Sequence, residues 1–325
     1  MSILVFTENW DGRFKKLSFE LLTFAKKVAT QAGDDVIALS IGKVPDEELA
    51  KLAAYGADRI IKVEDDRLNA LVNKAYSAVI AQVAAQTDAN VIIFAHNFTG
   101  KALAPRVAVK MNAGLVTGVT EIPAKMDPFT VKKKVFTNKA FANVEVKSSV
   151  KVLTLFQNSV GVEENPGKGS VESFTPQLSD KDFLTKVVEV NKVTGKVLLT
   201  DAEIVISGGR GMKSPDKWAP LEELSGLLGG ALACSRPVSD EGWRPHTEHV
   251  GQTGKIIAPN LYFAFGISGA IQHLGGVSSS KCIVAVNTDK DAPIFEAADY
   301  GIVGDVHAVL PEFVQAVKDL KESQG

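Results

Sequence analysis

The sequence predicts an α/β protein made of two doubly wound domains in tandem. Short apolar runs alternate with segments of helical spacing from the first residues onward, a pattern typical of a parallel sheet covered by helices on both faces. The pattern changes in the middle of the chain and starts again near residue 204. A length of 325 residues also suggests about two domains. We therefore expect an N-terminal domain over 1–193 and a C-terminal domain over 194–325.

The first half of the chain carries the expected strands of the N-terminal domain as short apolar runs. Between these runs, apolar residues recur at helical spacing over 17–28, 47–55 and 71–85, which predicts helices that bury one face. Gly56 follows the second of these segments, where a glycine commonly ends a helix. The expected strands are Ile3–Phe6, Val36–Leu39, Arg59–Val63 and Val91–Ala95.

The middle of the chain, over 135–156, has apolar residues that often alternate with polar ones. Such alternation favours antiparallel strands, so we expect antiparallel strands added to the first sheet. The segment 163–170 has the composition of a loop, and the domain boundary is expected near 192–196. The apolar positions behind the antiparallel prediction are Val144, Val146, Val150, Val152 and Leu153.

The second half of the chain starts a new strand–helix series, which predicts a second doubly wound unit. Its expected helices span Leu221–Leu228 and Pro311–Leu320. Its expected strands are Ile204–Ile206, Leu261–Phe265, Ile283–Val286 and Tyr300–Val303.

Charge, cysteine content and hydropathy narrow the class of protein. The formal net charge of −2 gives no reason to expect a nucleic-acid partner. The two cysteines, Cys234 and Cys282, lie far apart and fit a reducing compartment. The sequence contains no run of about 18 apolar residues, so we expect no membrane span. The N-terminus lacks the pattern of a signal peptide, so we expect a cytoplasmic bacterial protein, or a mitochondrial matrix protein only after removal of a transit peptide.

Ligands of open α/β sheets bind beyond the carboxyl ends of the strands, and in the second half those ends carry glycine and polar clusters. The cluster 207–211 follows the first strand, and 266–273 follows the strand Leu261–Phe265 and enters a helix. Small residues at a helix start expose N–H groups to an anion. A further polar glycine loop spans 251–255. Together with Arg236, Asn287 and Asp305, these clusters favour a large anionic ligand such as a dinucleotide.

Each cluster also has a simpler interpretation. Glycine pairs are common in turns, Asn287 fits a turn residue, and Arg236 and Asp305 fit surface charges. For His273, a ligand contact and a buried core histidine remain equally open. In the first half, the segment 96–101 fits a turn and helix cap better than an anion site. Spacings typical of metal ligands, of a Walker phosphate loop and of the GxGxxG dinucleotide fingerprint are absent from the sequence.

These clusters resemble the sequence blocks of electron transfer flavoprotein α subunits. The segment Leu261–His273 followed by Ile283–Asn287 is similar to the family signature. The resemblance implies a C-terminal Rossmann-like FAD-binding domain and an N-terminal sheet similar to that of adenine-nucleotide hydrolases. It is weaker in the N-terminal domain, where 137–143 and 155–159 depart from the family pattern. Further matching blocks are 207–211, 235–237, 250–255, 298–305 and, more weakly, 100–106.

The resemblance implies FAD as cofactor and a set of residues that bind it. Arg236 would lie beside the isoalloxazine ring and favour the reduced, anionic flavin. Thr253 would bond near flavin N5, and His273 would approach the pyrimidine carbonyl, where negative charge gathers on reduction. Gln252 and Gln272 would serve the ribityl chain and the ring. The other implied contacts are Val250 and Gly251 in the same loop, Arg210, Ser268, Gly269, Ala270 and Ile271 at the pyrophosphate, and Ser235, Asn287, Asp305 and Val306 at the pyrophosphate or adenosine end.

The resemblance also implies an electron carrier rather than an enzyme with its own substrate. FAD would accept electrons from flavin dehydrogenases, such as the acyl-CoA dehydrogenases of fatty acid β-oxidation, and pass them to a quinone oxidoreductase. A β subunit carrying AMP would complete a heterodimer. The alternatives are an electron-bifurcating member whose partner holds a second FAD, a nicotinamide-binding transhydrogenase-like module, and a nucleotide-hydrolysing enzyme. Arg236 and Gln272-His273 argue against the transhydrogenase, and the missing phosphate loop argues against the hydrolase.

Overall fold

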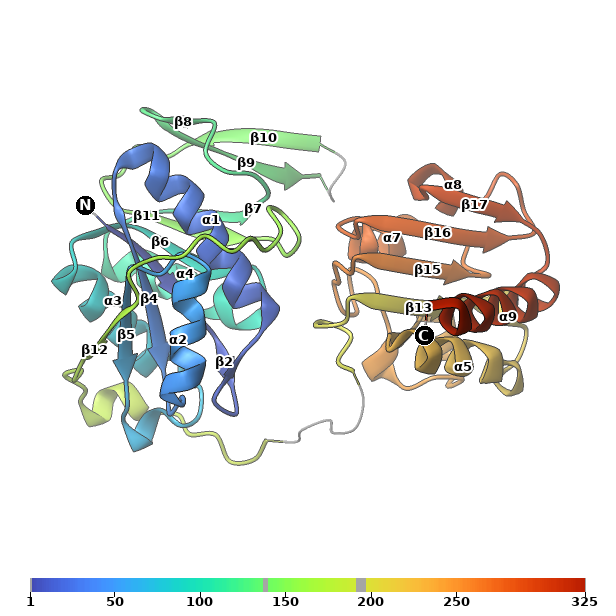
Figure 1. Ribbon diagram of the computed structural model, residues 1–325, viewed down its shortest axis with the longest axis horizontal. Coiled ribbons are helices and arrows are strands. Elements are labelled where there is room, and N and C mark those ends of the chain that lie inside the picture. The colour runs from blue at the N-terminus through green and yellow to red at the C-terminus, as the bar shows by residue number, and fades with distance from the viewer. Residues whose placement is uncertain (1, 137–139, 191–196, 325) are drawn as a thin grey trace. The chain divides into compact units, whose positions relative to one another are not determined.

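The computed structural model describes residues 2–136, 140–190 and 197–324. The chain divides into two compact units, residues 1–191 and 192–325. Each unit is a sheet covered by helices, so the predicted α/β class is confirmed (Figure 1). The expected boundary between residues 193 and 194, and the departing residues 137–139, lie outside the described residues.

The sheet of the first unit has the strand order β10-β9-β7-β11-β6-β1-β4-β5-β12, with β8 paired to β9. The strands from β7 to β12 in this order run parallel. The pairs β7–β9, β8–β9 and β9–β10 are antiparallel. The strands are β1 Ser2–Phe6, β4 Asp35–Ile41, β5 Arg59–Val63, β6 Ala89–Ala95, β7 Gly114–Val119, β8 Lys125–Met126, β9 Phe129–Val135, β10 Ala140–Glu145, β11 Lys151–Leu155 and β12 Ser170–Ser173, and a separate two-stranded sheet pairs β2 Asn9–Trp10 with β3 Arg13–Phe14.

Helices cover both faces of this sheet. Apolar side chains of α1 (Lys16–Ala32) and α2 (Asp46–Ala54) pack in one core, and those of α3 (Asn73–Gln86) and α4 (Phe98–Lys110) pack in the other. The helix α4 begins after Asn97, whose side-chain oxygen accepts a 2.8 Å hydrogen bond from the backbone N–H of Gly100. The interpretation of this segment as a helix cap is therefore confirmed.

The structure corrects the prediction for Val152 and Leu153. These residues lie in β11, which is not an added antiparallel strand but a parallel strand between β6 and β7. Both side chains are fully buried. A continuous apolar run of this kind is typical of a parallel strand covered on both faces. The prediction was wrong because it extended the alternation of apolar and polar residues, which lies just before this run, into the run itself. The predicted antiparallel addition is confirmed for β10, where Val144 lies opposite Val131.

The sheet of the second unit has the order β14-β13-β15-β16-β17, and all its strand pairs are parallel. From β13 the chain first moves to β14 on one side and then to β15 on the other. In a doubly wound sheet this point of reversal opens the crevice where ligands bind. The strands are β13 Ile204–Gly208, β14 Ala231–Cys234, β15 Leu261–Phe265, β16 Cys282–Asn287 and β17 Tyr300–Val303.

Helices also cover both faces of the second sheet. On one face α5 (Ala219–Leu228) and α9 (Val306–Gln324) pack their apolar side chains around the buried Trp218. On the other face lie α7 (Ile271–Val277) and α8 (Ile294–Ala297), while the short helix α6 (Arg236–Asp240) follows β14. Among the helices of the described residues, none combines the length and the apolar character that crossing a membrane requires.

Candidate functional site

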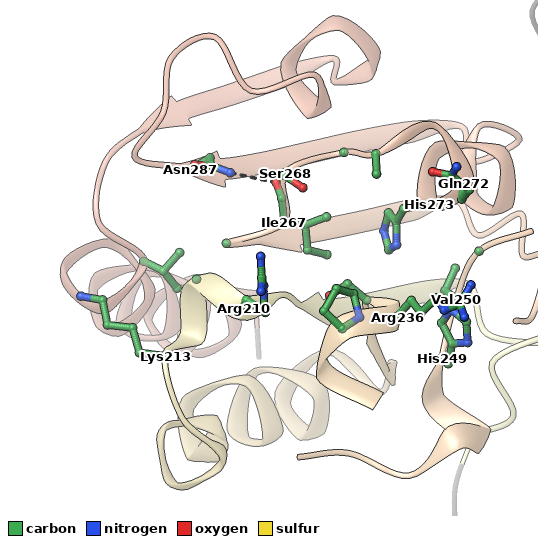
Figure 2. A pocket seen from close by; sticks show the side chains of 18 of the residues that line it. Arg210, Lys213, Arg236, His249, Val250, Ile267, Ser268, Gln272, His273 and Asn287 are labelled. Atoms are coloured by element: carbon green, nitrogen blue, oxygen red, sulfur yellow. Dashed lines mark hydrogen bonds between the residues drawn. The ribbon is translucent and has the colours of Figure 1, made fainter. Parts of the chain in front are cut away.

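A cavity of about 540 Å³ lies at the point of reversal in the second sheet. Its walls are the loops that follow β13, β14, β15 and β16, the start of α9, and the loop around Val250 (Figure 2). A volume of this size is ordinary for a small-molecule site. The fold therefore brings together the carboxyl ends that the sequence marked with glycine and polar clusters.

Two loops of the cavity wall interlock through glycines. The backbone N–H of Gly211 donates a 3.0 Å hydrogen bond to the carbonyl oxygen of Gly266. A Cβ on Gly211 would lie 2.6 Å from Gly266 Cα, and a Cβ on Gly209 would collide with the Gly266 carbonyl. Gly266 itself has φ +63°, a backbone conformation that side chains disfavour. The loops after β13 and β15 can pack this closely only because glycine stands at these positions.

One end of the cavity carries cationic and capping groups. The Lys213 ammonium lies 3.3 Å from the Asp305 carboxylate. Asp305 also accepts a 2.9 Å hydrogen bond from His307 N, and so caps the start of α9. This backbone hydrogen bond, followed by the bond from Lys213, holds the pKa of Asp305 below its usual range. Arg210 lies on the same wall, and the cations there suit an anionic group.

Asn287 fixes the loop that follows β15. Its side-chain Nδ2 donates a 2.9 Å hydrogen bond to the carbonyl oxygen of Ile267 (Figure 2). Its side-chain oxygen accepts a 3.0 Å hydrogen bond from the backbone N–H of Asp289. Asn287 therefore acts both as the turn residue that the sequence suggested and as a brace for the cavity wall.

His273 lies at the other end of the cavity, on the first turn of α7 (Figure 2). The side chain is 7% exposed, and its Nε2 lies 2.8 Å from the Tyr262 hydroxyl. Its Nδ1 is buried and has no hydrogen-bond partner within the described parts of the chain. Burial lowers the pKa of His273 to about 4, with the nearby His249 acting in the same direction and the Val250 backbone opposing it. The imidazole is therefore neutral near pH 7.

Arg236 and His249 complete this end of the cavity. Arg236 opens α6, and its side chain is 62% exposed, with Nε 3.2 Å from an Asp240 carboxylate oxygen. This exposure and the pairing with Asp240 agree with the simpler interpretation of Arg236 as a surface charge. His249 is 2% exposed, and burial lowers its pKa. The two ends of the cavity therefore differ, with Lys213 and Asp305 at one and neutral imidazoles beside an exposed guanidinium at the other.

The cavity wall contains every implied binding residue except Gln252 and Ile271. A Cβ on Gly275 would lie 2.7 Å from Gln252 Nε2, so this side chain packs against α7. Ile271 is 41% exposed. The wall also contains residues beyond the implied ones, and most of these adjoin implied residues, while Lys213 reaches Asp305 across the fold. Of these further wall residues, Gly211, Pro237, Gly266 and Ile267 lie in clusters or blocks that the sequence marked, whereas Lys213, His249 and Thr288 were missed.

The described residues contain no group of three or more His, Cys, Asp or Glu side chains placed to hold a metal ion. The candidate site thus consists of backbone N–H groups, two interlocked glycine loops and a few polar side chains. Such a site can bind an extended anionic ligand and tune its charge.

Comparison with known proteins gives consistent similarities over both units. A family model described as an electron transfer flavoprotein domain matches residues 3–179, and another described as an electron transfer flavoprotein FAD-binding domain matches residues 198–278. The chain is 39% identical to the electron transfer flavoprotein subunit alpha of Syntrophomonas wolfei, over 97% of this chain and 98% of that protein. It is 35% identical to the subunit alpha of Bacillus subtilis, over 98% of each chain. It is also 31% identical to the acryloyl-CoA reductase electron transfer subunit beta of Anaerotignum propionicum, over 99% of this chain and 96% of that protein.

Proposed function

The chain belongs to the electron transfer flavoprotein α-subunit family, and we propose that it carries electrons on FAD from flavin dehydrogenases to a quinone oxidoreductase. Membership implies a β subunit as partner and FAD as cofactor. In this proposal the chain makes and breaks no bond of a substrate. Its residues hold the cofactor, and they set how strongly the oxidised and reduced forms are bound.

The residues of the cavity fit FAD. Glycines let the loops after β13 and β15 pack closely against each other at the edge of the sheet where a dinucleotide would bind. Arg210 and Lys213 supply positive charge at the same end, where the pyrophosphate and adenosine would bind. At the other end, the buried Nδ1 of His273 needs a partner. When bound, FAD supplies the electron-accepting chemistry that the side chains lack.

One observation carries the proposal: the two ends of the cavity differ in chemical character. An anion-binding end with Lys213 and the start of α9 suits the nucleotide half of a dinucleotide. The end with His273, Thr253 and Arg236 offers donors and a charge to an electron-accepting ring. A donor or positive charge placed where negative charge develops favours the reduced form. We therefore assign the ring system to this second end.

The partners follow from the family and from the printed names of relatives. One relative is an electron transfer subunit of acryloyl-CoA reductase, which supports a flavin enzyme acting on acyl-CoA as the donor or acceptor here. The β subunit would carry AMP in an ordinary carrier and a second FAD in a bifurcating one. We place the heterodimer in the cytoplasm of a bacterium.

An electron-transfer assay tests this function. The chain is produced together with its β subunit, and the absorbance of the flavin is followed after mixing with an acyl-CoA dehydrogenase and its substrate. The proposal expects the flavin to bleach, and to regain its colour when a quinone oxidoreductase and quinone are added. A purified protein without a flavin spectrum would favour the nicotinamide-binding alternative instead.

A further inference from the structure

A buried pair of side chains lies directly behind the cavity wall. Tyr262 belongs to β15 and is fully buried, and its hydroxyl lies 2.8 Å from His273 Nε2. The two rings are tilted by 46°, with their centroids 6.1 Å apart. His273 itself lines the cavity (Figure 2). The imidazole therefore connects the buried Tyr262, through Nε2, to the cavity wall.

A neutral imidazole has one nitrogen that donates and one that accepts, so the bond at Nε2 decides what Nδ1 can do. A phenol is a stronger acid than a neutral imidazole, and an imidazole nitrogen is a better acceptor than a phenol oxygen. The favoured arrangement of the pair is thus a tyrosine that donates to Nε2. Burial raises the pKa of Tyr262, and the neighbouring Ser207 offsets only part of that rise, so the phenol keeps its proton.

We infer that Tyr262 is a positioning residue that sets the tautomer of His273, with the phenol donating to Nε2 so that Nδ1 carries the proton. This inference rests on the proposed function, since it gives the tautomer its use toward FAD. A protonated Nδ1 donates to an oxygen that gains negative charge on reduction. The opposite tautomer would turn a nitrogen lone pair toward that oxygen and disfavour the reduced cofactor.

The burial of Nδ1 strengthens the inference. Nδ1 has no hydrogen-bond partner among the residues that the structure describes. A buried donor without an acceptor destabilises a protein, and a cofactor oxygen would remove that cost.

The test uses the full heterodimer with Tyr262→Phe, which keeps the ring and removes the hydroxyl. Tyr76→Phe is the matched control, because Tyr76 is also buried and donates a 2.7 Å hydrogen bond to Leu68 O in the first unit. Nitrogen-15 NMR of labelled histidine reports which ring nitrogen of His273 carries the proton. Potentiometric titration reports the reduction potential of FAD.

In the parent protein we expect the proton on Nδ1. In Tyr262→Phe we expect much of it on Nε2. Reduced FAD should then lose about tenfold in affinity relative to oxidised FAD, which is a more negative potential by roughly 30 mV for a two-electron couple. Tyr76→Phe should match the parent in both measurements.

A parent protein with its proton on Nε2 would overturn the inference, and so would a Tyr262→Phe variant with unchanged tautomer and potential. If that variant does not fold, the tautomer of the parent alone decides. Failure of the proposed function looks different: the heterodimer would lack FAD, while the tautomer could still be measured in the cofactor-free chain.

Discussion

Replacing Gly209 with alanine should disrupt the cavity wall through a steric clash alone. The residue has φ −111°, which any amino acid can adopt, so the backbone conformation is not the obstacle. The obstacle is the Gly266 carbonyl, with which a Cβ would collide. Overpacking typically costs about 1–3 kcal/mol, and we expect about 3 kcal/mol here because a backbone group cannot rotate away. The loops after β13 and β15 should separate, and FAD should be retained poorly.

Gly226→Ala is the matched control in the same unit. It lies in α5, and apart from its chain neighbours and the backbone of its own helix, a Cβ there would meet no atom of the described residues within 4 Å. Alanine in a helix should raise the free energy of unfolding by up to about 1 kcal/mol. Urea unfolding followed by tryptophan fluorescence measures both effects, because Trp218 is buried in the second unit. Equal stability and equal FAD content in the two variants would refute the steric reasoning.

Three further predictions concern charge. Arg236→Ala should keep FAD bound but lower its reduction potential by roughly 20–60 mV in a potentiometric titration, because one exposed charge is lost. Arg236→Lys should restore most of the lost potential. An unchanged potential in Arg236→Ala would contradict the role of Arg236. Burial lowers the pKa of His273 from 6.5 to about 4, so the folded state resists protonation, and the free energy of unfolding should fall by about 3 kcal/mol as pH drops from 6.5 to 4. In urea titrations at different pH, His273→Gln should reduce this dependence on pH. An identical dependence in the parent and the variant would count against the assignment to His273. Burial raises the pKa of Asp58, but hydrogen bonds from Val36 N and Lys26 lower the pKa overall, so the stabilising contribution of Asp58 should be lost as pH falls below about 4. Asp58→Asn should therefore destabilise the first unit more at pH 7 than at pH 3. The reverse order would be evidence against the pairing of Asp58 with Lys26.

Local sequence patterns predicted strands best where an apolar run stands between residues that end it. The strands Leu261–Phe265 and Tyr300–Val303 have the predicted bounds. The short strand β14 was missed because alanines in Ala231–Cys234 carry little β-propensity. The wrong prediction for β11 has a different cause. Antiparallel and fully buried parallel strands meet within a few residues there, and only the pairing in space separates them.

The site shows the same division between local and long-range information. The glycine clusters could be found because strand ends of one sheet meet at one edge. The contact of Lys213 with Asp305 joins positions far apart in sequence, so no local sequence pattern predicts it. The hydrogen bond between Tyr262 and His273 could not be predicted from the sequence either, because the pattern around Tyr262 indicates only a residue of an apolar strand. Sequence thus located the site, while the groups that orient its side chains required the fold.

The most direct test of the account is to count cofactors in the heterodimer purified after joint production of both subunits. The account predicts a yellow protein with one FAD bound in the second unit of this chain, and with AMP as the nucleotide of the β subunit. A second FAD per heterodimer would identify a bifurcating partner and leave the site of this chain intact. A colourless heterodimer that takes up no added FAD would contradict the central claim, namely that the loops around the cavity hold this cofactor.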